Sequence, residues 1–322
     1  MLREMAVSAI RTSRLSKDYG LGRGLFDLDL EVSRHEVFGF LGPNGSGKTT
    51  TIRCLMGMIR PTRGSAHVFG LDCRRDVVAV KRKVGYLPGD IPQFGSLRGK
   101  EVVAYLGGMR GGVDPSTVRD IAGRFDLDLS RRFREYSSGN KQKLGILLAF
   151  MHSPDLLILD EPTSGLDPLN QQQFYALLGE ARGRGATVFL SSHILSEVEH
   201  VCDRVAILRA GRLARVAQLE DLRHIRVHRV ELEFAPGASI PIEKISAAAG
   251  VESSTIEDRR VTCVVYGSFE PLLEAIRDAR VTDLVSNEPT LEEVFLTYYQ
   301  DAPRADAPPD RGKKAAPPEL GD

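Results

Sequence analysis

Eight consecutive residues near the N-terminus have the pattern of a phosphate-binding loop. They satisfy every fixed position of the motif G-x-x-x-x-G-K-S/T. The loop consists of Gly42, Pro43, Asn44, Gly45, Ser46, Gly47, Lys48 and Thr49. Glycines let the backbone turn tightly and point several N–H groups at one anion. The motif therefore predicts a site for the phosphates of a nucleotide.

The residues at the end of this loop have separate predicted roles. Lys48 would reach the β- and γ-phosphates, and the hydroxyl of Thr49 would bind Mg²⁺. Thr50 follows them and is included in the predicted nucleotide site. The apolar run 36–41 predicts a buried strand, and residues 48–58 predict a helix whose dipole favours an anion at its start. This strand, loop and helix are the context that the motif requires.

A second segment, Leu156 to Glu161, is an apolar run that ends in two acids. A carboxylate at the end of a strand beside the phosphate loop can hold the Mg²⁺ shell through water, and Asp160 fits that role. Glu161 then lies where it can orient and deprotonate the water that attacks the γ-phosphate. Such a base contributes roughly 10²–10⁴ in rate. A strand that merely ends in a polar turn is the alternative, and the phosphate loop upstream argues against it.

Three more segments follow in a fixed order: residues 136–142, 164–167 and 191–193. In this order and spacing, residues 9–220 resemble the ATP-binding cassette (ABC) ATPases. In that family, two cassettes close head to tail over two ATP molecules. The phosphate loop of one cassette then faces the signature segment of the other.

The resemblance assigns the signature segment to residues 136–140. Ser137 and Gly139 would contact the γ-phosphate of the partner's ATP, which suits a hydroxyl and helix N-terminal amides. The family's usual signature is Leu-Ser-Gly-Gly-Gln, so Tyr136, Ser138 and Asn140 depart from it. Ser138 keeps its backbone N–H, so an anion site can survive the change.

Three further residues take roles from the same resemblance. Asp167 corresponds to the aspartate between the cassettes, although it also suits a helix N-cap before Pro168. His193 corresponds to the switch histidine that would hold the γ-phosphate against Glu161. Tyr19 lies where the family stacks an aromatic ring on adenine, and simple packing is its alternative.

The segment 84–90 departs from the family pattern. Many relatives carry a glutamine at the position of Gly89, where it contacts Mg²⁺ and senses the transport partner. Glycine has no side chain for this, so Asp90 or Gln93 would have to substitute. The Tyr-Leu-Pro-Gly form resembles a branch of the family that powers drug and antibiotic exporters.

Composition limits the classes of partner. The 322 residues include 43 basic and 43 acidic side chains, which gives no electrostatic case for nucleic acid. The four cysteines are scattered without a CxxC pair, which fits a reducing cytoplasm and argues against a metal or disulfide framework. The sequence shows no signal peptide and no apolar run that approaches the roughly 20 residues of a membrane span. A membrane role would therefore come through a partner.

These patterns predict an α/β fold of the P-loop NTPase cassette type over residues 1–220. Its sheet would be mainly parallel, with an antiparallel β subdomain over residues 9–40 and a helical subdomain over residues 92–145. A small C-terminal α+β domain would occupy residues 221–300. The tail 301–322 is rich in proline, alanine and charge and is expected to be disordered.

The C-terminal domain shows no catalytic constellation. Strands are predicted at 227–234 and 261–266, and helices at 270–280 and 291–299. Its Pro-Thr-Leu-Glu-Glu-Val-Phe ending resembles the accessory domain of drug-exporter ATPases. Dimer stabilisation, regulation or a passive role all remain open for it.

The resemblance implies an ATPase that energises the export of drugs or antibiotics. With Mg²⁺ and ATP, it would act at the cytoplasmic face of the cell membrane, bound to a separately encoded permease and paired with a second, identical cassette. A soluble ABC ATPase acting on ribosomes or DNA, or an importer ATPase, is the alternative. Soluble ABC ATPases of that kind usually carry two cassettes or a special insertion, and this chain has neither. The Gly89 segment and the C-terminal ending argue against an importer ATPase.

Overall fold

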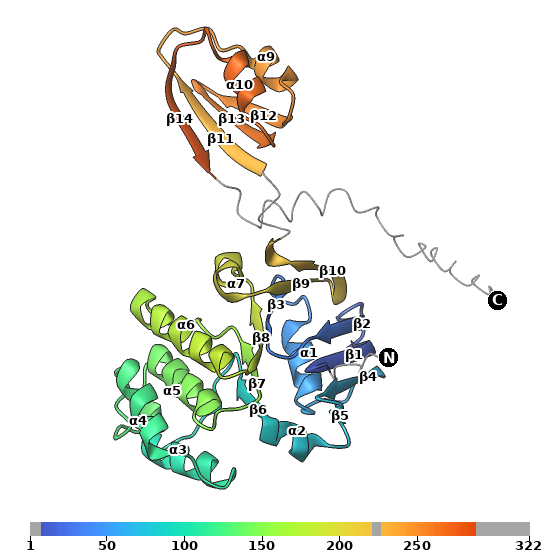
Figure 1. Cartoon of the computed structure of the whole chain (residues 1–322), viewed down its shortest axis with the longest axis vertical. Coiled ribbons are helices and arrows are strands. Elements are labelled where there is room, and N and C mark those ends of the chain that lie inside the picture. Colours follow the sequence, from blue (N-terminus) through green and yellow to red (C-terminus); the bar gives the residue numbers. More distant parts are fainter. Residues whose placement is uncertain (1–7, 221–226, 288–322) are drawn as a thin grey trace, which may run out of the picture. The chain divides into compact units, whose positions relative to one another are not determined.

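The computed structural model describes residues 8–220 and 227–287 of the chain. These residues form two compact units, which divide between His224 and Ile225. Figure 1 shows both units, and each is described by itself. The first unit contains all the motifs named above.

An antiparallel sheet of four strands begins the first unit, in the order β2-β1-β4-β5. The strands are β1 (Ile10–Asp18), β2 (Gly24–Val32), β4 (Arg63–Val68) and β5 (Leu71–Asp72). In β2 the buried residues alternate with exposed ones, so one face of this strand packs on the core. The alternation in residues 9–40 therefore predicted the antiparallel strands β1 and β2 correctly, whereas residues 37–40 belong to β3 (Val37–Leu41), which pairs in parallel in the central sheet.

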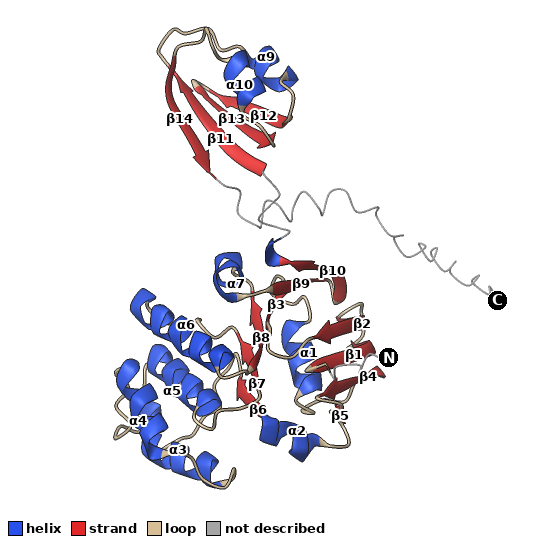
Figure 2. Cartoon of the chain, in the orientation of Figure 1, coloured by secondary structure: helices blue, strands red, loops and turns tan. Residues whose placement is uncertain are grey.

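A six-stranded sheet forms the centre of this unit, in the order β10-β9-β3-β8-β7-β6 (Figure 2). Its strands are β3 (Val37–Leu41), β6 (Val84–Leu87), β7 (Leu156–Asp160), β8 (Thr187–Ser192), β9 (Arg204–Arg209) and β10 (Arg212–Gln218). All neighbours pair in parallel except β10, which is antiparallel to β9. Every residue of β3, β7 and β8 is buried, as expected for central strands covered on both faces. The predicted mainly parallel sheet is confirmed.

Helices connect these strands. They are α1 (Lys48–Leu55), α2 (Val77–Lys83), α6 (Pro168–Gly183) and α7 (Leu195–Val201). Helix α1 ends at Leu55, so the predicted end at residue 58 is wrong. Gly57 has φ of +62°, and a Cβ there would lie 2.5 Å from the carbonyl oxygen of Cys73. A glycine in the left-handed region commonly ends a helix, and here no other residue would fit.

Helices dominate residues 99–150, where the sequence predicted a helical subdomain over residues 92–145. They are α3 (Gly99–Gly108), α4 (Pro115–Arg124), a 3₁₀ turn (Phe133–Glu135) and α5 (Ser138–Phe150). Helices α3 and α4 both pack against α5 (Figure 1). Helix α5 also packs against β6, so it links the helical part of the unit to the central sheet.

Over residues 227–287, the second unit is a four-stranded antiparallel sheet with two short helices. Its sheet order is β12-β13-β11-β14. The elements are β11 (Val227–Phe234), α9 (Ile242–Ala247), β12 (Val251–Glu257), β13 (Arg260–Tyr266), α10 (Glu270–Ala275) and β14 (Val281–Asn287). Helix α10 is shorter than the predicted 270–280. The predicted helix at 291–299 and the tail 301–322 lie outside the described residues.

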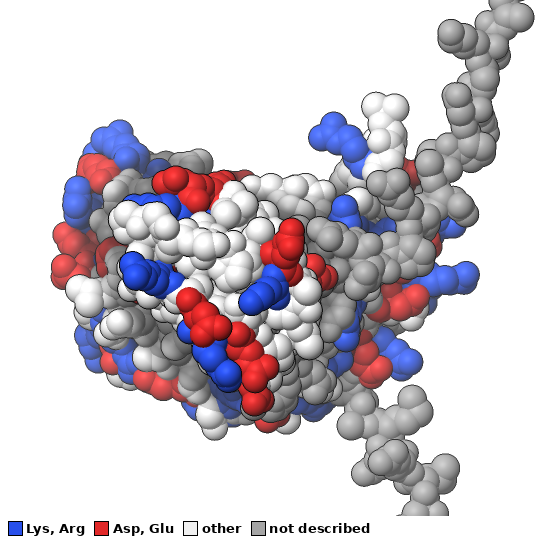
Figure 3. All heavy atoms as spheres, turned by 90° about the horizontal axis from the view of Figure 1, so that it is seen from above, with Lys and Arg blue, Asp and Glu red and all other residues white. Residues whose placement is uncertain are grey.

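Acidic and basic side chains alternate on the face drawn in Figure 3. This mixture agrees with the equal totals of 43 basic and 43 acidic residues. Over the residues that the structure describes, none of the helices has both the length and the apolar character that crossing a bilayer requires.

Candidate active site

The topology brings the predicted catalytic segments together. Strands β3, β8 and β7 are parallel neighbours, so the loops that follow them leave the sheet at the same edge. In register, Leu41 lies beside Ser192, and Asp160 lies beside Ser191. Ligands of open α/β sheets bind at this carboxyl edge.

A cavity of 320 Å³ lies over the phosphate loop. Residues of this loop line it, together with Tyr19, Thr50 and Glu161. Gly42 is not among the lining residues; a Cβ there would lie 2.5 Å from the carbonyl oxygen of Leu208. It therefore acts by letting the loop pass close to the neighbouring backbone. Tyr19 is 56% exposed, so one face of its ring is available to a planar ligand.

Lys48 is buried at the base of this cavity, with only 5% of its surface exposed. Its Nζ donates to the carbonyl oxygen of Gly42 at 2.6 Å and lies 3.6 Å from Oε1 of Glu161. Burial lowers the pKa of Lys48, while the carboxylates of Glu161 and Asp160 act in the opposite direction. The ammonium group is thus already held where a phosphate chain would pass.

Asp160 is buried, and other side chains hold both of its oxygens. The Thr49 hydroxyl donates to Oδ2 at 3.0 Å, and the Ser191 hydroxyl donates to Oδ1. Mg²⁺ prefers such hard oxygen ligands and keeps several waters. The two residues that the sequence assigned to the metal therefore lie side by side and fit that ion.

Glu161 lines the cavity, and His193 contacts Glu161. Nδ1 of His193 lies 3.1 Å from Oε1 of Glu161, and both side chains are partly exposed. Glu161 has φ of +49°, which is unusual for a residue with a side chain. Such strain persists only where the surroundings hold it, and it is concentrated at functional sites.

The signature residues begin a helix away from this cavity. The Ser137 hydroxyl caps α5 by accepting from the backbone N–H of Asn140 at 3.2 Å. Asp167 caps α6 in the same way, accepting from the N–H of Asn170 at 3.0 Å, and Pro168 begins that helix. Within the described chain, none of Ser137, Gly139 and Asp167 lines the phosphate cavity of its own cassette.

Gln142 is a site residue that sequence reasoning missed. Its buried amide donates to the carbonyl oxygen of Pro162 at 2.8 Å and to that of Glu161 at 3.3 Å. The signature helix is therefore tied directly to the backbone of Glu161. A polar residue two positions before the apolar run of α5 was the only available signal.

Gly89 lies next to the carboxylate of Asp160. A Cβ at this position would be 3.4 Å from Oδ2 of Asp160. Asp90 lines a neighbouring groove of 670 Å³, which Arg53, Ile91 and Phe94 also line. Gln93 is not one of its lining residues. Of the two suggested substitutes for the missing glutamine, Asp90 is thus the one that lines this groove.

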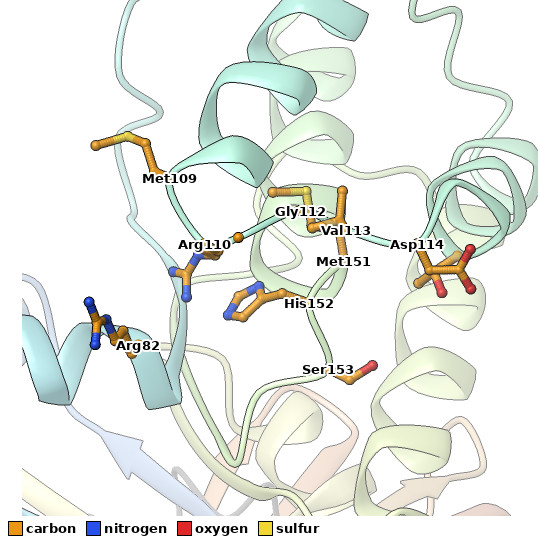
Figure 4. A pocket seen from close by; sticks show the side chains of 11 residues that line it. Arg82, Met109, Arg110, Gly112, Val113, Asp114, Met151, His152 and Ser153 are labelled. Carbon is orange, nitrogen blue, oxygen red and sulfur yellow. The ribbon is translucent and has the colours of Figure 1, made fainter.

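A second, polar hollow of 570 Å³ lies nearby (Figure 4). Arg110, which follows α3, and His152, which follows α5, both line it (Figure 4). Arg110 donates to the carbonyl oxygens of Lys81 and Val84, each at 3.1 Å. Burial, with the charge of Arg110 as the next cause, lowers the pKa of His152 to about 4. This histidine is therefore neutral at pH 7.

Comparison with known proteins decides the family. The model of the ABC transporter family matches residues 25–164. The bacitracin transport ATP-binding protein of Enterococcus faecalis is 31% identical over 89% of this chain and 94% of its own length. The chain belongs to the ABC transporter family. A daunorubicin resistance ATP-binding protein of Streptomyces coeruleorubidus is 33% identical over 92% of this chain and 98% of its own.

Solved structures agree with this assignment. The ATP-binding subunit of an ABC transporter superposes with a TM-score of 0.62 at 31% identity and covers 67% of this chain and 92% of its own. A dimeric cassette bound to ADP and Pi superposes with a TM-score of 0.60 over 65% of this chain and 98% of its own. At 20% identity, the second likeness shows the fold alone. The cassette is thus an ABC ATPase by family and by fold.

Proposed function

We propose that this cassette is the ATP-hydrolysing subunit of an exporter of antibiotics or related drugs. The observation that carries the proposal is the extent of the similarity. The bacitracin and daunorubicin relatives match along nine tenths of the chain, which includes most of the second unit as well as the shared ATPase core. A third relative, a probable multidrug transporter protein of Escherichia coli, is 32% identical over 67% of this chain and 38% of its own length.

The proposed chemistry assigns one role to each group at the sheet edge. Lys48 and the loop amides hold the β- and γ-phosphates, while Thr49 and Asp160 hold Mg²⁺, which supplies charge neutralisation when bound. Glu161 accepts the proton of the attacking water. His193, 3.1 Å from Glu161, keeps that carboxylate oriented and contacts the γ-phosphate.

A second cassette would complete the site. Ser137 and Gly139 lie at the start of α5, where the positive end of the helix dipole favours an anion, and they do not line the cavity of their own chain. An identical partner placed head to tail would bring them to the γ-phosphate. This proposal makes each ATP site the product of two chains.

The groove of 670 Å³ is the proposed docking surface for a membrane permease. Apolar side chains such as Met58, Ile91 and Leu106 line it, and basic residues including Arg53 and Lys81 lie among them. Gly89, whose Cβ position faces Asp160, lies beside it. A permease element bound in this groove would therefore contact the neighbours of Gly89, and Gly89 itself lies against the proposed metal ligand Asp160. The groove would then face the cytoplasmic side of the membrane.

Co-expression with a candidate permease, chosen as a neighbouring reading frame that encodes about six apolar spans of about 20 residues, tests the function. We expect the two proteins to co-purify from detergent-extracted membranes and to raise resistance to an amphipathic antibiotic. Glu161→Gln should remove resistance and leave the complex intact. If the cassette instead fractionates with ribosomes or DNA and no membrane protein accompanies it, the alternative of a soluble ABC ATPase is correct. Uptake of a nutrient in place of drug efflux would indicate an importer.

A further inference from the structure

A buried carboxylate on α7 has no role in the scheme above. Glu197 is only 8% exposed, and hydroxyl groups hold both of its oxygens. The Ser192 hydroxyl donates to Oε2 at 2.6 Å, and the Thr163 hydroxyl donates to Oε1. Both hydroxyl residues are themselves buried. A buried carboxylate is costly unless it is hydrogen-bonded, so this arrangement is a specific one.

The two hydroxyls belong to the two catalytic loops. Thr163 follows Glu161 by two residues, and Ser192 directly precedes His193. Glu161 and His193 then meet at 3.1 Å. The contacts therefore form a closed ring. Glu197 joins Thr163 to Ser192 through hydrogen bonds, and the backbone joins these two residues to Glu161 and His193. The contact between Glu161 and His193 closes the ring.

We propose that Glu197 is a positioning residue that sets the geometry of the pair formed by Glu161 and His193. The inference rests on the catalytic roles proposed for those two residues. Glu161 has a strained backbone with φ of +49°, and both side chains are partly exposed, so the pair cannot hold its own geometry. A displacement of about 1 Å in a catalytic group can cost about 10²-fold in rate.

Ser192 extends this control to the far side of His193. Besides donating to Glu197, its hydroxyl oxygen accepts from the backbone N–H of Ile194 at 2.9 Å. The residues before and after His193 are thus fixed by one hydroxyl that Glu197 orients. Loss of the carboxylate should release this turn. In the contacts described, the phosphate loop meets the catalytic pair through Lys48, which lies 3.6 Å from Glu161, so the backbone amides of the loop should keep their geometry.

The test compares Glu197→Ala with the unmodified full-length chain in Mg²⁺–ATP hydrolysis. We expect kcat to fall about tenfold or more while KM and the Kd for a fluorescent ATP analogue stay within about threefold. Thr163→Val and Ser192→Ala should each lower kcat by a smaller factor than Glu197→Ala. Thr163→Ser keeps the hydroxyl group, so its kcat should equal that of the wild type. Glu197→Gln keeps one acceptor oxygen, so it provides a milder variant if the alanine variant folds poorly.

Coupling to His193 separates positioning from simple structural support. The kcat of the double variant His193→Ala/Glu197→Ala should lie within about twofold of the kcat of His193→Ala alone. Both substitutions disrupt the same arrangement, the contact between Glu161 and His193. Asp203 supplies the control, since its carboxylate also joins two elements, accepting from the N–H of Val37 at 2.9 Å and from Arg182 at 2.8 Å. Asp203→Ala should lower the melting temperature and keep kcat.

Three results would overturn the inference: a wild-type kcat in Glu197→Ala, a fall in kcat matched by an equal fall in the fraction of chains that bind the ATP analogue, as a general loss of folded protein would give, or independent, multiplying effects with His193→Ala. Failure of the proposed function looks different. It would appear as full hydrolysis by His193→Ala or Glu161→Gln themselves, whatever the result at Glu197.

Discussion

At the scale of single residues, the buried side chain of Lys48 is held in position by contacts within the protein. Its Nζ donates to the Gly42 carbonyl and lies 3.6 Å from Glu161. Lys48→Ala should weaken ATP binding by about tenfold or more, because a buried phosphate charge would lose its cation. Titration with a fluorescent ATP analogue measures this. Lys83→Ala removes an exposed lysine paired with Asp155 and should leave the Kd unchanged.

Glu161 should affect the reaction and spare the binding. Glu161→Gln keeps nearly the same shape, so ATP should still bind, while steady-state phosphate release should fall about 10²-fold or more because the base is lost. A dimer stabilised by ATP should then appear in light scattering. Hydrolysis within about threefold of the wild-type rate would show that another group is the base.

Which site residues the sequence reveals depends on whether they are neighbours in the chain. The phosphate loop, Asp160 and Glu161 stand in short runs whose order is recognisable, so their positions at one sheet edge could be predicted. Gln142 and Glu197 act through contacts with Pro162 and Thr163, 20 and 34 residues away. No local pattern encodes such contacts, because they depend on how α5 and α7 pack on the sheet.

At the scale of elements, the central strands were predictable because burial on both faces produces continuous apolar runs such as that of β7. Helix ends were less predictable. Helix α1 stops where the backbone of Cys73 comes within 2.5 Å of a Cβ at Gly57, and this is a tertiary contact. Strand β10 has a mixed, mostly exposed pattern, so the edge of the sheet carried no clear signal.

The polar hollow beside α3 should make stability depend on pH. His152 has a pKa of about 4 in the folded chain against 6.5 as an ordinary histidine, so the unfolded chain binds its proton first as pH falls. Stability should therefore be full above pH 6.5 and decline between there and pH 4. We expect His152→Gln to flatten this decline between pH 7 and pH 5 by a few degrees in melting temperature.

Calorimetry across that pH range measures the effect, with the exposed His200→Gln as the control. A wild-type slope in His152→Gln would mean that other groups, such as the carboxylates, produce the acid sensitivity. The test is cleanest above pH 5, because most carboxylates with ordinary pKa values remain ionised there.

At the scale of the whole molecule, the chain consists of two compact units, and the nucleotide site belongs to the first. The residues that line the phosphate cavity run from Tyr19 to Ala210, within the unit that ends at His224. The second unit has its own core of buried residues, including Leu232 and Phe234. Nucleotide binding should therefore be a property of the first unit alone.

Truncation after residue 224 tests this separation. Because no cavity residue is removed, the Kd for ATP should stay within about threefold of that of the full chain. Truncation after residue 300 is the matched control; it removes a proline- and charge-rich segment that composition predicts to bury little, so it should change neither the melting temperature nor the ATPase rate. If only the shorter chain loses the ATP-stabilised dimer of Glu161→Gln, the second unit stabilises the pairing of cassettes. If the shorter chain loses ATP binding itself, the nucleotide site depends on the second unit and the division at residue 224 is not a functional one.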